Sequence, residues 1–354
     1  LWAAAFAENL YGYDFRDSSV FLINTENSNI RDRRFIRAPI VDHDGNVWLP
    51  GDGFYIYDYP RGFRHYRHPY DFRQFNTGMG KVNDELWLGY RERGIVKLDP
   101  LTNRTEHIST TTKGSGHLSS DLIPSIVQLS NGKVALSGFD SLMIHNPESG
   151  ATKSIYISGT NRYVFEDSRQ NLWMGGYRGL YQFTLDGEQV AQFKLPPFYG
   201  DTSNLIQTIA EDSQGRIWFS SMVKGIGMLD PVANKVTQYL PDESNTNAIP
   251  TAVTTDIACH NEHIWIGTDV GLVRFDMATE EFTTYNGEHG LANNFIASVV
   301  ATDHEIWMAT YSGISSFDPK NETFANYDFS DGLINRSYYG RAKFLAEDGT
   351  LYFG

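Results

Sequence analysis

The stretch IWIGTDVGLVRFD, residues Ile264–Asp276, decides the fold because its pattern returns along the chain. It consists of an apolar residue, Trp, another apolar residue, a turn closed by Gly, and a strand that ends at Asp. Close copies are IWMATYSGISSFD at 306–318 and LWLGYRERGIVKLD at 86–99. Weaker copies occur within residues 47–58, 172–183 and 216–230. The chain is therefore built from repeats.

Every tryptophan of the chain stands at one position of this pattern. These anchors are Trp2, Trp48, Trp87, Trp173, Trp218, Trp265 and Trp307. Ala135 takes the position in a degenerate copy, and Tyr352 takes it in the last copy, so successive anchors are 38 to 48 residues apart. A period of this length in a strand-rich sequence predicts a propeller or a related repeat array.

One repeat contains four short strands separated by turn residues. In the copy around Trp218, strands are expected over NLIQTIAED, 216–220, 226–229 and VTQYL, with Gly, Asn and Asp-Pro between them. Four antiparallel strands make one propeller blade. We therefore predict an all-β fold, a β-propeller over residues 1–354 as a single domain, with seven blades and eight as the alternative. Residues 1–30 and 338–354 are expected to be partial repeats of a longer sensor protein.

Composition excludes several classes of function. A formal charge of −14 argues against nucleic-acid binding, which requires a basic surface. The single cysteine, Cys259, cannot form an intrachain disulfide. No apolar run approaches the length of a membrane span, so we expect no membrane contact by this fragment. The tryptophans are expected to pack between blades, and not to form a sugar-stacking ladder.

The repeat closely resembles the two-component regulator propeller repeat. The resemblance rests on DSQGRIWFSSMVKGIGMLDP, NEHIWIGTDVGLVRFD and DHEIWMATYSGISSFDP, and it extends over the whole chain. It implies the extracytoplasmic, periplasmic sensor region of hybrid histidine kinases or related bacterial signalling proteins. It also implies seven-bladed propellers and an oligosaccharide ligand, and it allows a homodimer through the full-length sensor. The unit around Ala135 departs from the pattern because it lacks both Trp and Gly-Thr.

Signatures of catalysis and metal binding are absent from the sequence. There is no zinc-protease, nucleophile-elbow, phosphate-loop or CxxC motif. His65 and His68 lack a third ligand, so we expect neither a metal nor a cofactor. Most aspartates recur at fixed places in the repeat, whereas Asp140, Asp201 and Asp269 do not. These three keep a polysaccharide hydrolase or lyase open as an alternative.

Binding residues are expected where the repeats vary. The turn between the second and third strands and the loop into the next blade emerge on one face, where substitutions leave the blade intact. Two GYR copies there, at 89–91 and 176–178, place an aromatic ring beside a guanidinium, which suits sugars and carboxylates. The candidate ligand-binding residues are Tyr90, Arg91, Arg93, Tyr177, Arg178, Lys224, Asp269, Tyr311, Asn335 and Arg336.

These observations predict a non-catalytic periplasmic sensor propeller. It would bind an oligosaccharide or another small ligand and relay the signal to an output domain across the membrane. The alternatives are the propeller-fold hydrolase or lyase and a scaffold for protein interactions.

Overall fold

The computed structural model describes most of the chain from residue 76 onward. The described residues are 76–100, 102, 104–112, 117–159, 161–193, 206–245, 247–328, 331, 333, 343–345, 349 and 351–353, with the backbone of six strands before residue 58. Contacts divide the chain into two compact units, one of residues 1–65 and 327–335 and one of residues 66–326 and 336–354. Each unit has more contacts within itself than with the other unit. The single domain over 1–354 stays a prediction.

The first unit contains two three-stranded antiparallel sheets. One pairs β1 (Trp2–Ala4), β2 (Leu10–Asp14) and β3 (Ser19–Ile23). The other pairs β4 (Ile40–Val41), β5 (Val47–Pro50) and β6 (Phe54–Tyr57). Each sheet pairs its strands in chain order.

The second unit contains six four-stranded antiparallel sheets, numbered blades 1 to 6 in chain order. Blades 1 to 3 are formed by β7 (Asn76–Val82), β8 (Glu85–Tyr90), β9 (Ile95–Leu98) and β10 (Thr105–Ile108); β11 (Ile126–Gln128), β12 (Val134–Ser137), β13 (Ser141–His145) and β14 (Thr152–Tyr156); and β15 (Asn161–Glu166), β16 (Leu172–Gly176), β17 (Gly179–Phe183) and β18 (Gln189–Phe193). Blades 4 to 6 are formed by β19 (Ile206–Glu211), β20 (Ile217–Ser221), β21 (Gly225–Asp230) and β22 (Lys235–Tyr239); β23 (Thr254–His260), β24 (His263–Thr268), β25 (Leu272–Asp276) and β26 (Glu281–Tyr285); and β27 (Ile296–Ala301), β28 (Ile306–Thr310), β29 (Gly313–Asp318) and β30 (Thr323–Tyr327). The four strands expected around Trp218 are confirmed.

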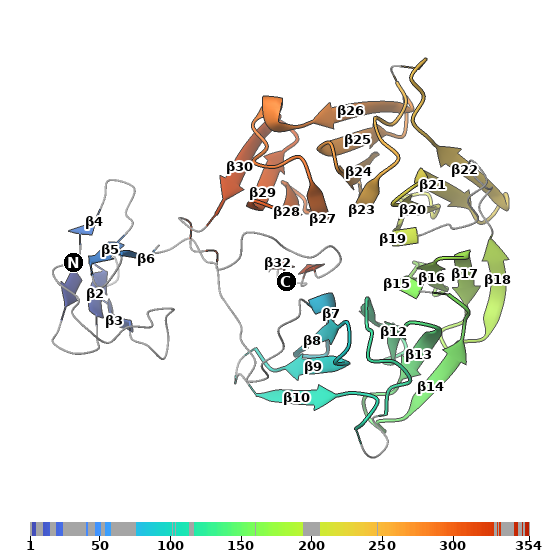
Figure 1. Ribbon diagram of the computed structural model, residues 1–354, viewed down its shortest axis with the longest axis horizontal. Helices are drawn as coiled ribbons and strands as arrows, with labels where there is room; N and C mark the ends of the chain where they lie inside the picture. The colour runs from blue at the N-terminus through green and yellow to red at the C-terminus, as the bar shows by residue number, and fades with distance from the viewer. Residues whose placement is uncertain are drawn as a thin grey trace. The chain divides into compact units, whose positions relative to one another are not determined.

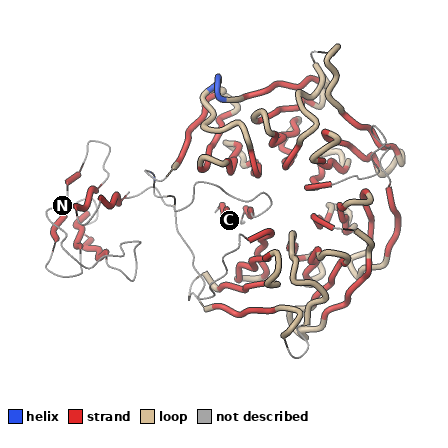
Figure 2. Tube along the Cα trace, in the orientation of Figure 1, coloured by secondary structure: helices blue, strands red, loops and turns tan. Residues whose placement is uncertain are grey.

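The blades form a ring with their first strands innermost (Figure 1). The first strands contact one another in the order β7, β11, β15, β19, β23 and β27. The two-stranded sheet of β31 (Lys343–Leu345) and β32 (Leu351–Phe353) follows, and β31 contacts both β27 and β7. It therefore occupies a seventh position between the last and first blades. Strands are the main regular elements of the described residues (Figure 2), and no helix in this part of the chain has the length and hydrophobicity of a membrane span.

The expected blade number needs correction. The described residues form six four-stranded blades, whereas the sequence predicted seven, with eight as the alternative. The repeats around Trp2 and Trp48 form the two separate three-stranded sheets of the first unit. The last repeat supplies only β31 and β32 to the described structure.

The tryptophans pack between neighbouring blades, as predicted. Trp173 lies in one cluster with Ile206 and Ile209 of blade 4, and Trp265 lies with Ile296 and Val299 of blade 6. Trp87 and Trp218 make the same kind of contact with blades 2 and 5. These four rings are fully buried, whereas Trp307, which precedes the two-stranded sheet, is only partly buried. The indole therefore fills the space between adjacent four-stranded sheets.

Aspartates fix the turns on the face where first strands end. Asp212, which is buried, accepts hydrogen bonds at Oδ1 from Gln214 N (2.9 Å) and Arg216 N (3.0 Å), and at Oδ2 from Trp218 Nε1 (2.7 Å). Asp167 binds Trp173 Nε1 in the same way, at 2.8 Å. One carboxylate thus ties the first turn of a blade to its anchor ring.

Candidate functional site: the turn face

The candidate site is a face of the ring, here called the turn face. It carries the turns between second and third strands and the loops that connect a fourth strand to the next blade. Because strand direction alternates within a blade, these segments share one end of the sheet. Backbone hydrogen bonds join them: Gly94 N donates to Asp121 O (2.9 Å), and Gly225 N donates to Ala252 O (2.9 Å). The turns are therefore held in place by the connecting loops.

Two of the predicted residues are buried on this face. Tyr90 is 4% exposed, and burial raises the pKa of its phenol well above the usual range. Its carbonyl oxygen accepts a hydrogen bond from Ile123 N (3.0 Å), which joins blade 1 to the connecting loop. Lys224 is 1% exposed at the turn of blade 4. Neither side chain is presented to solvent, so both support the face from within.

Three of the predicted arginines, Arg91, Arg93 and Arg178, are exposed, and so is Tyr177. Arg91 and Arg93 lie in the turn of blade 1, and Tyr177 and Arg178 form the turn of blade 3. The Tyr177–Arg178 turn packs over Gly159 of the neighbouring connecting loop: a Cβ at Gly159 would lie 3.4 Å from Tyr177 Cβ. Glycine is favoured at this place because φ of Gly159 is 105°, in the left-handed region.

Asp140 fixes that same connecting loop. Its Oδ1 accepts a hydrogen bond from Gly159 N at 2.9 Å, and its carbonyl oxygen accepts one from Ile157 N at 2.9 Å. Asp140 is one of the three acids on which the hydrolase or lyase alternative depends, and its carboxylate makes a structural hydrogen bond to this loop. Asp201, His65 and His68 lie outside the described residues. Among the described side chains, no group of three or more His, Cys, Asp and Glu residues could hold a metal ion.

Asp269 lies in the turn of blade 5. Thr268 closes this turn, because its Oγ1 donates to Gly271 O (2.6 Å) and accepts from Val270 N (3.1 Å). Asp269 Oδ1 is buried and has no hydrogen-bond partner within the described part of the chain. A buried carboxylate oxygen without a donor carries a desolvation cost, so this position favours a ligand that donates a hydrogen bond.

Blade 6 presents a flat aromatic platform. Tyr311 is 53% exposed and stacks on Phe295, with ring centroids 4.4 Å apart and an interplanar angle of 10°. Asn293 fixes the loop beneath it: its Nδ2 donates to Ser312 Oγ (3.1 Å), and its Oδ1 accepts from Phe295 N (2.9 Å). The platform is therefore set by hydrogen bonds on both sides of the stack.

Sequence reasoning missed several exposed apolar side chains of the turn face. These are Phe139 of blade 2 and Met222 and Val223 of blade 4. They lie in the turns between second and third strands, as Tyr177 and Tyr311 do in blades 3 and 6. Phe139 was overlooked because its repeat lacks the anchor tryptophan, although its position in the turn could have identified it. The structure brings the described candidates to one face over blades 1, 3, 4, 5 and 6. Asn335 and Arg336 lie outside the described residues.

Charge differs between the two faces of the ring. The turn face carries the exposed residues Arg91, Arg93 and Arg178 together with the exposed acids Glu92, Asp242, Glu243 and Glu288. The turns of the opposite face carry many exposed acids: Asp84, Glu148, Asp186, Glu188, Glu262, Glu280, Glu281, Asp303 and Glu322. An anionic ligand is therefore favoured locally beside the arginines of the turn face, and it meets more exposed acids on the opposite face.

Comparison with known proteins supports the repeat assignment. Residues 200–222 match the family model described as two component regulator propeller. The predicted resemblance is confirmed. No curated protein matches the chain by sequence.

Solved structures share the fold at low sequence identity. The extracellular domain of a putative hybrid two component system from B. thetaiotaomicron is 19% identical, with a TM-score of 0.75; the match covers 100% of this chain and 48% of that one. This chain thus spans about half the length of that relative. A catalytically inactive virginiamycin B lyase from Staphylococcus aureus, solved with quinupristin, is 14% identical, with a TM-score of 0.64 and coverage of 81% and 94%. The WD40 repeats of RRP9 are 12% identical, with a TM-score of 0.62 and coverage of 81% and 89%. These likenesses concern the propeller fold alone.

Proposed function

We propose that this chain is a non-catalytic sensor propeller whose turn face binds an oligosaccharide. The Phe295–Tyr311 platform carries the proposal, because an exposed flat ring packs well against the apolar face of a pyranose. Exposed Arg91, Arg93 and Arg178 add guanidinium groups that can bind a carboxylate in a bidentate manner. These features favour a saccharide that carries uronate groups.

The proposed setting is the periplasmic part of a membrane signalling protein. The match to the two component regulator propeller supports this setting. The extracellular placement of the B. thetaiotaomicron relative supports it as well. Ligand binding would favour one of two arrangements of a homodimeric sensor by binding it more tightly, and an output domain across the membrane would respond.

Calorimetry against matched neutral and uronate-containing oligosaccharides tests the binding proposal. Tyr311→Ala removes the exposed ring of the platform, and Val232→Ala shortens a side chain that is 81% exposed in the turn between β21 and β22, on the opposite face. Loss of a stacking contact worth about 0.5–1.5 kcal/mol weakens binding by roughly 2- to 12-fold. Val232→Ala is expected to leave Kd unchanged.

Arg178→Gln tests the charged part of the proposal. It is expected to weaken binding of uronate-containing ligands more than that of neutral ones. The proposal is wrong if no saccharide binds, or if the Tyr311 and Val232 variants bind equally well. Turnover of a saccharide by the purified chain would instead favour the hydrolase or lyase alternative.

A further inference from the structure

The inner strands of neighbouring blades contact each other at equivalent positions, and at two of these positions the residue is charged. On each first strand, one residue pairs with the anchor residue of the second strand. The residues two positions before this pairing partner are, in blades 1 to 6, Gly78, Ser125, Tyr163, Thr208, Asp256 and Ser298. The residues one before that partner are Met79, Ile126, Val164, Ile209, Ile257 and Val299. In the seventh position, where Phe344 pairs with Tyr352, the corresponding residue is Lys343. Asp256 and Lys343 are thus the only charged members of the two sets.

At two junctions, a side-chain hydroxyl of one blade accepts a hydrogen bond from a backbone N–H of the next blade. Ser125 Oγ accepts a hydrogen bond from Val164 N at 3.3 Å, and Thr208 Oγ1 accepts one from Ile257 N at 3.2 Å. Asp256 Oδ2 accepts from Val299 N at 2.7 Å, at the equivalent place between blades 5 and 6. A neutral hydroxyl is therefore sufficient for the contact between blades, and the negative charge of Asp256 is not needed for it.

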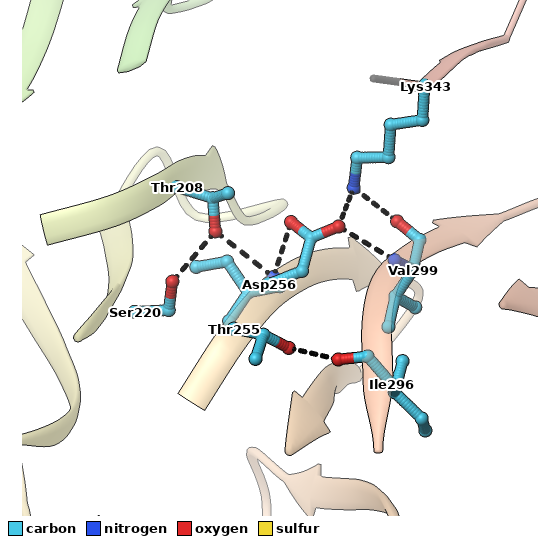
Figure 3. A network of polar contacts seen from close by, with 8 residues as sticks. Thr208, Ser220, Thr255, Asp256, Ile296, Val299 and Lys343 are labelled. Carbon is cyan, nitrogen blue, oxygen red and sulfur yellow. Dashed lines mark hydrogen bonds and ion pairs between the residues drawn. The ribbon is translucent and has the colours of Figure 1, made fainter. Parts of the chain in front are cut away.

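The negative charge of Asp256 instead forms an ion pair with Lys343. Lys343 Nζ donates to Asp256 Oδ2 and to Val299 O, so its side chain extends from β31 to the inner strands of blades 6 and 5 (Figure 3). The Asp256 side chain is 0% exposed and that of Lys343 is 11% exposed. We call Asp256 and Lys343 the closure pair.

A buried ion pair is costly to form, because both charges lose water. Breaking it by removing one partner is costlier still, because an unpaired charge is left inside. Such a pair therefore fixes one arrangement strongly even where it adds little net stability. Here the arrangement that it fixes is the position of β31, which contacts both β27 and β7.

We propose that the closure pair holds the two-stranded β31–β32 sheet in the seventh position, so that ring closure is a step separate from the folding of the six blades. When the pair is broken, β31–β32 leaves its place between blades 6 and 1 while the blades stay folded. The partly buried Trp307 lies in the blade that borders this position. The proposal is independent of the ligand.

Hydrogen exchange of the whole chain tests the proposal. Asp256→Asn keeps an oxygen that can accept from Val299 N but removes the charge, and Lys343→Met keeps the aliphatic stem but removes the ammonium. Both variants are expected to speed amide exchange in 343–345 and 351–353 by at least about 10-fold, with exchange in β16 and β20 unchanged.

Two further variants serve as controls. Ser125→Ala removes the equivalent neutral contact between blades 2 and 3 and is expected to leave exchange in β31–β32 unchanged. The second control combines Asp256→Thr with Lys343→Ile. It gives these two positions the residue types of their equivalents Thr208 and Ile257, which are in contact between blades 4 and 5. Because no buried charge is left unpaired, the double variant is expected to exchange more slowly in β31–β32 than either single variant.

Three results would overturn the proposal. The first is normal exchange of β31–β32 in both charge-removing variants, and the second is equal acceleration in all blades. The third is a double variant that exchanges faster than both single variants. The Lys343→Met variant keeps the Asp256–Val299 contact, so it provides the test even if substitution of Asp256 prevents folding.

Discussion

Replacing Asp212 by alanine should destabilise the protein far more than replacing an ordinary turn aspartate. The Asp212 carboxylate accepts from Gln214 N, Arg216 N and Trp218 Nε1, and it forms an ion pair with Arg216 Nε at 2.6 Å. Trp218 is fully buried, so its indole N–H has no access to water once the acceptor is removed. An unsatisfied buried donor costs about 1–3 kcal/mol.

The turn contributes the rest of the expected loss. Two backbone N–H groups lose their acceptor, at a net cost of about 0.5–1.5 kcal/mol each. Arg216 is partly exposed, and an ion pair of this kind contributes at most about 1 kcal/mol. We therefore expect Asp212→Ala to lower the free energy of unfolding by about 3–5 kcal/mol.

Urea denaturation of the whole chain, followed by circular dichroism, measures this loss. Asp242→Ala is the matched control, because Asp242 binds Ser244 N (2.9 Å) and Ser244 Oγ (2.6 Å) in an exposed turn without a tryptophan. It should cost less than about 1 kcal/mol. In a Trp218→Phe background, which has no indole N–H, Asp212→Ala should cost about 1–3 kcal/mol less than in the natural chain. Equal losses in the Asp212 and Asp242 variants would refute the reasoning.

Three other predictions follow from backbone and charge. Glu280 has a φ of 59°, so Glu280→Gly should raise the free energy of unfolding by about 0.5–1 kcal/mol, and a lower Tm would contradict this. A Cβ at Gly78 would lie 2.5 Å from Pro124 O, so Gly78→Ala should cost about 1–3 kcal/mol in urea denaturation, and an unchanged midpoint would contradict it. Hydrogen bonds from Thr279 N and Ala278 N lower the pKa of Asp276 below its usual 3.8. The stabilisation from Asp276 is therefore present above that pH and lost as pH falls through the lowered pKa, so Asp276→Asn should reduce the fall of Tm on acidification, and an unaltered fall would contradict this.

The repeat was predictable because each copy carries its own fold information. The anchor tryptophans, the Asp-Pro ends of third strands and the turn glycines act within one blade, so the four strands around Trp218 could be placed from local sequence alone. The blade number could not be predicted in this way, because it depends on which repeats pair in the same ring. Nothing in the copies around Trp2 and Trp48 distinguishes them locally from those of the second unit.

The site was predictable only in part. The turn positions of Tyr177, Arg178 and Tyr311 follow from the repeat, and all three are exposed. Tyr90 is buried because it is the last residue of β8 and precedes the turn, and Lys224 is buried although it lies in the turn of blade 4. The Phe295–Tyr311 stack joins a connecting loop to a turn 16 residues later, a contact that the repeat pattern does not encode.

The exposed charges of the described turns are arranged unevenly, with three arginines on the turn face and a denser set of acids in the turns of the opposite face. A polyanion near the ring is therefore repelled most strongly at the opposite face and attracted locally beside Arg91, Arg93 and Arg178. At physiological ionic strength this bias decays over about 8 Å, so it orients an encounter only at short range. Raising the salt concentration removes the bias without altering the exposed aromatic rings.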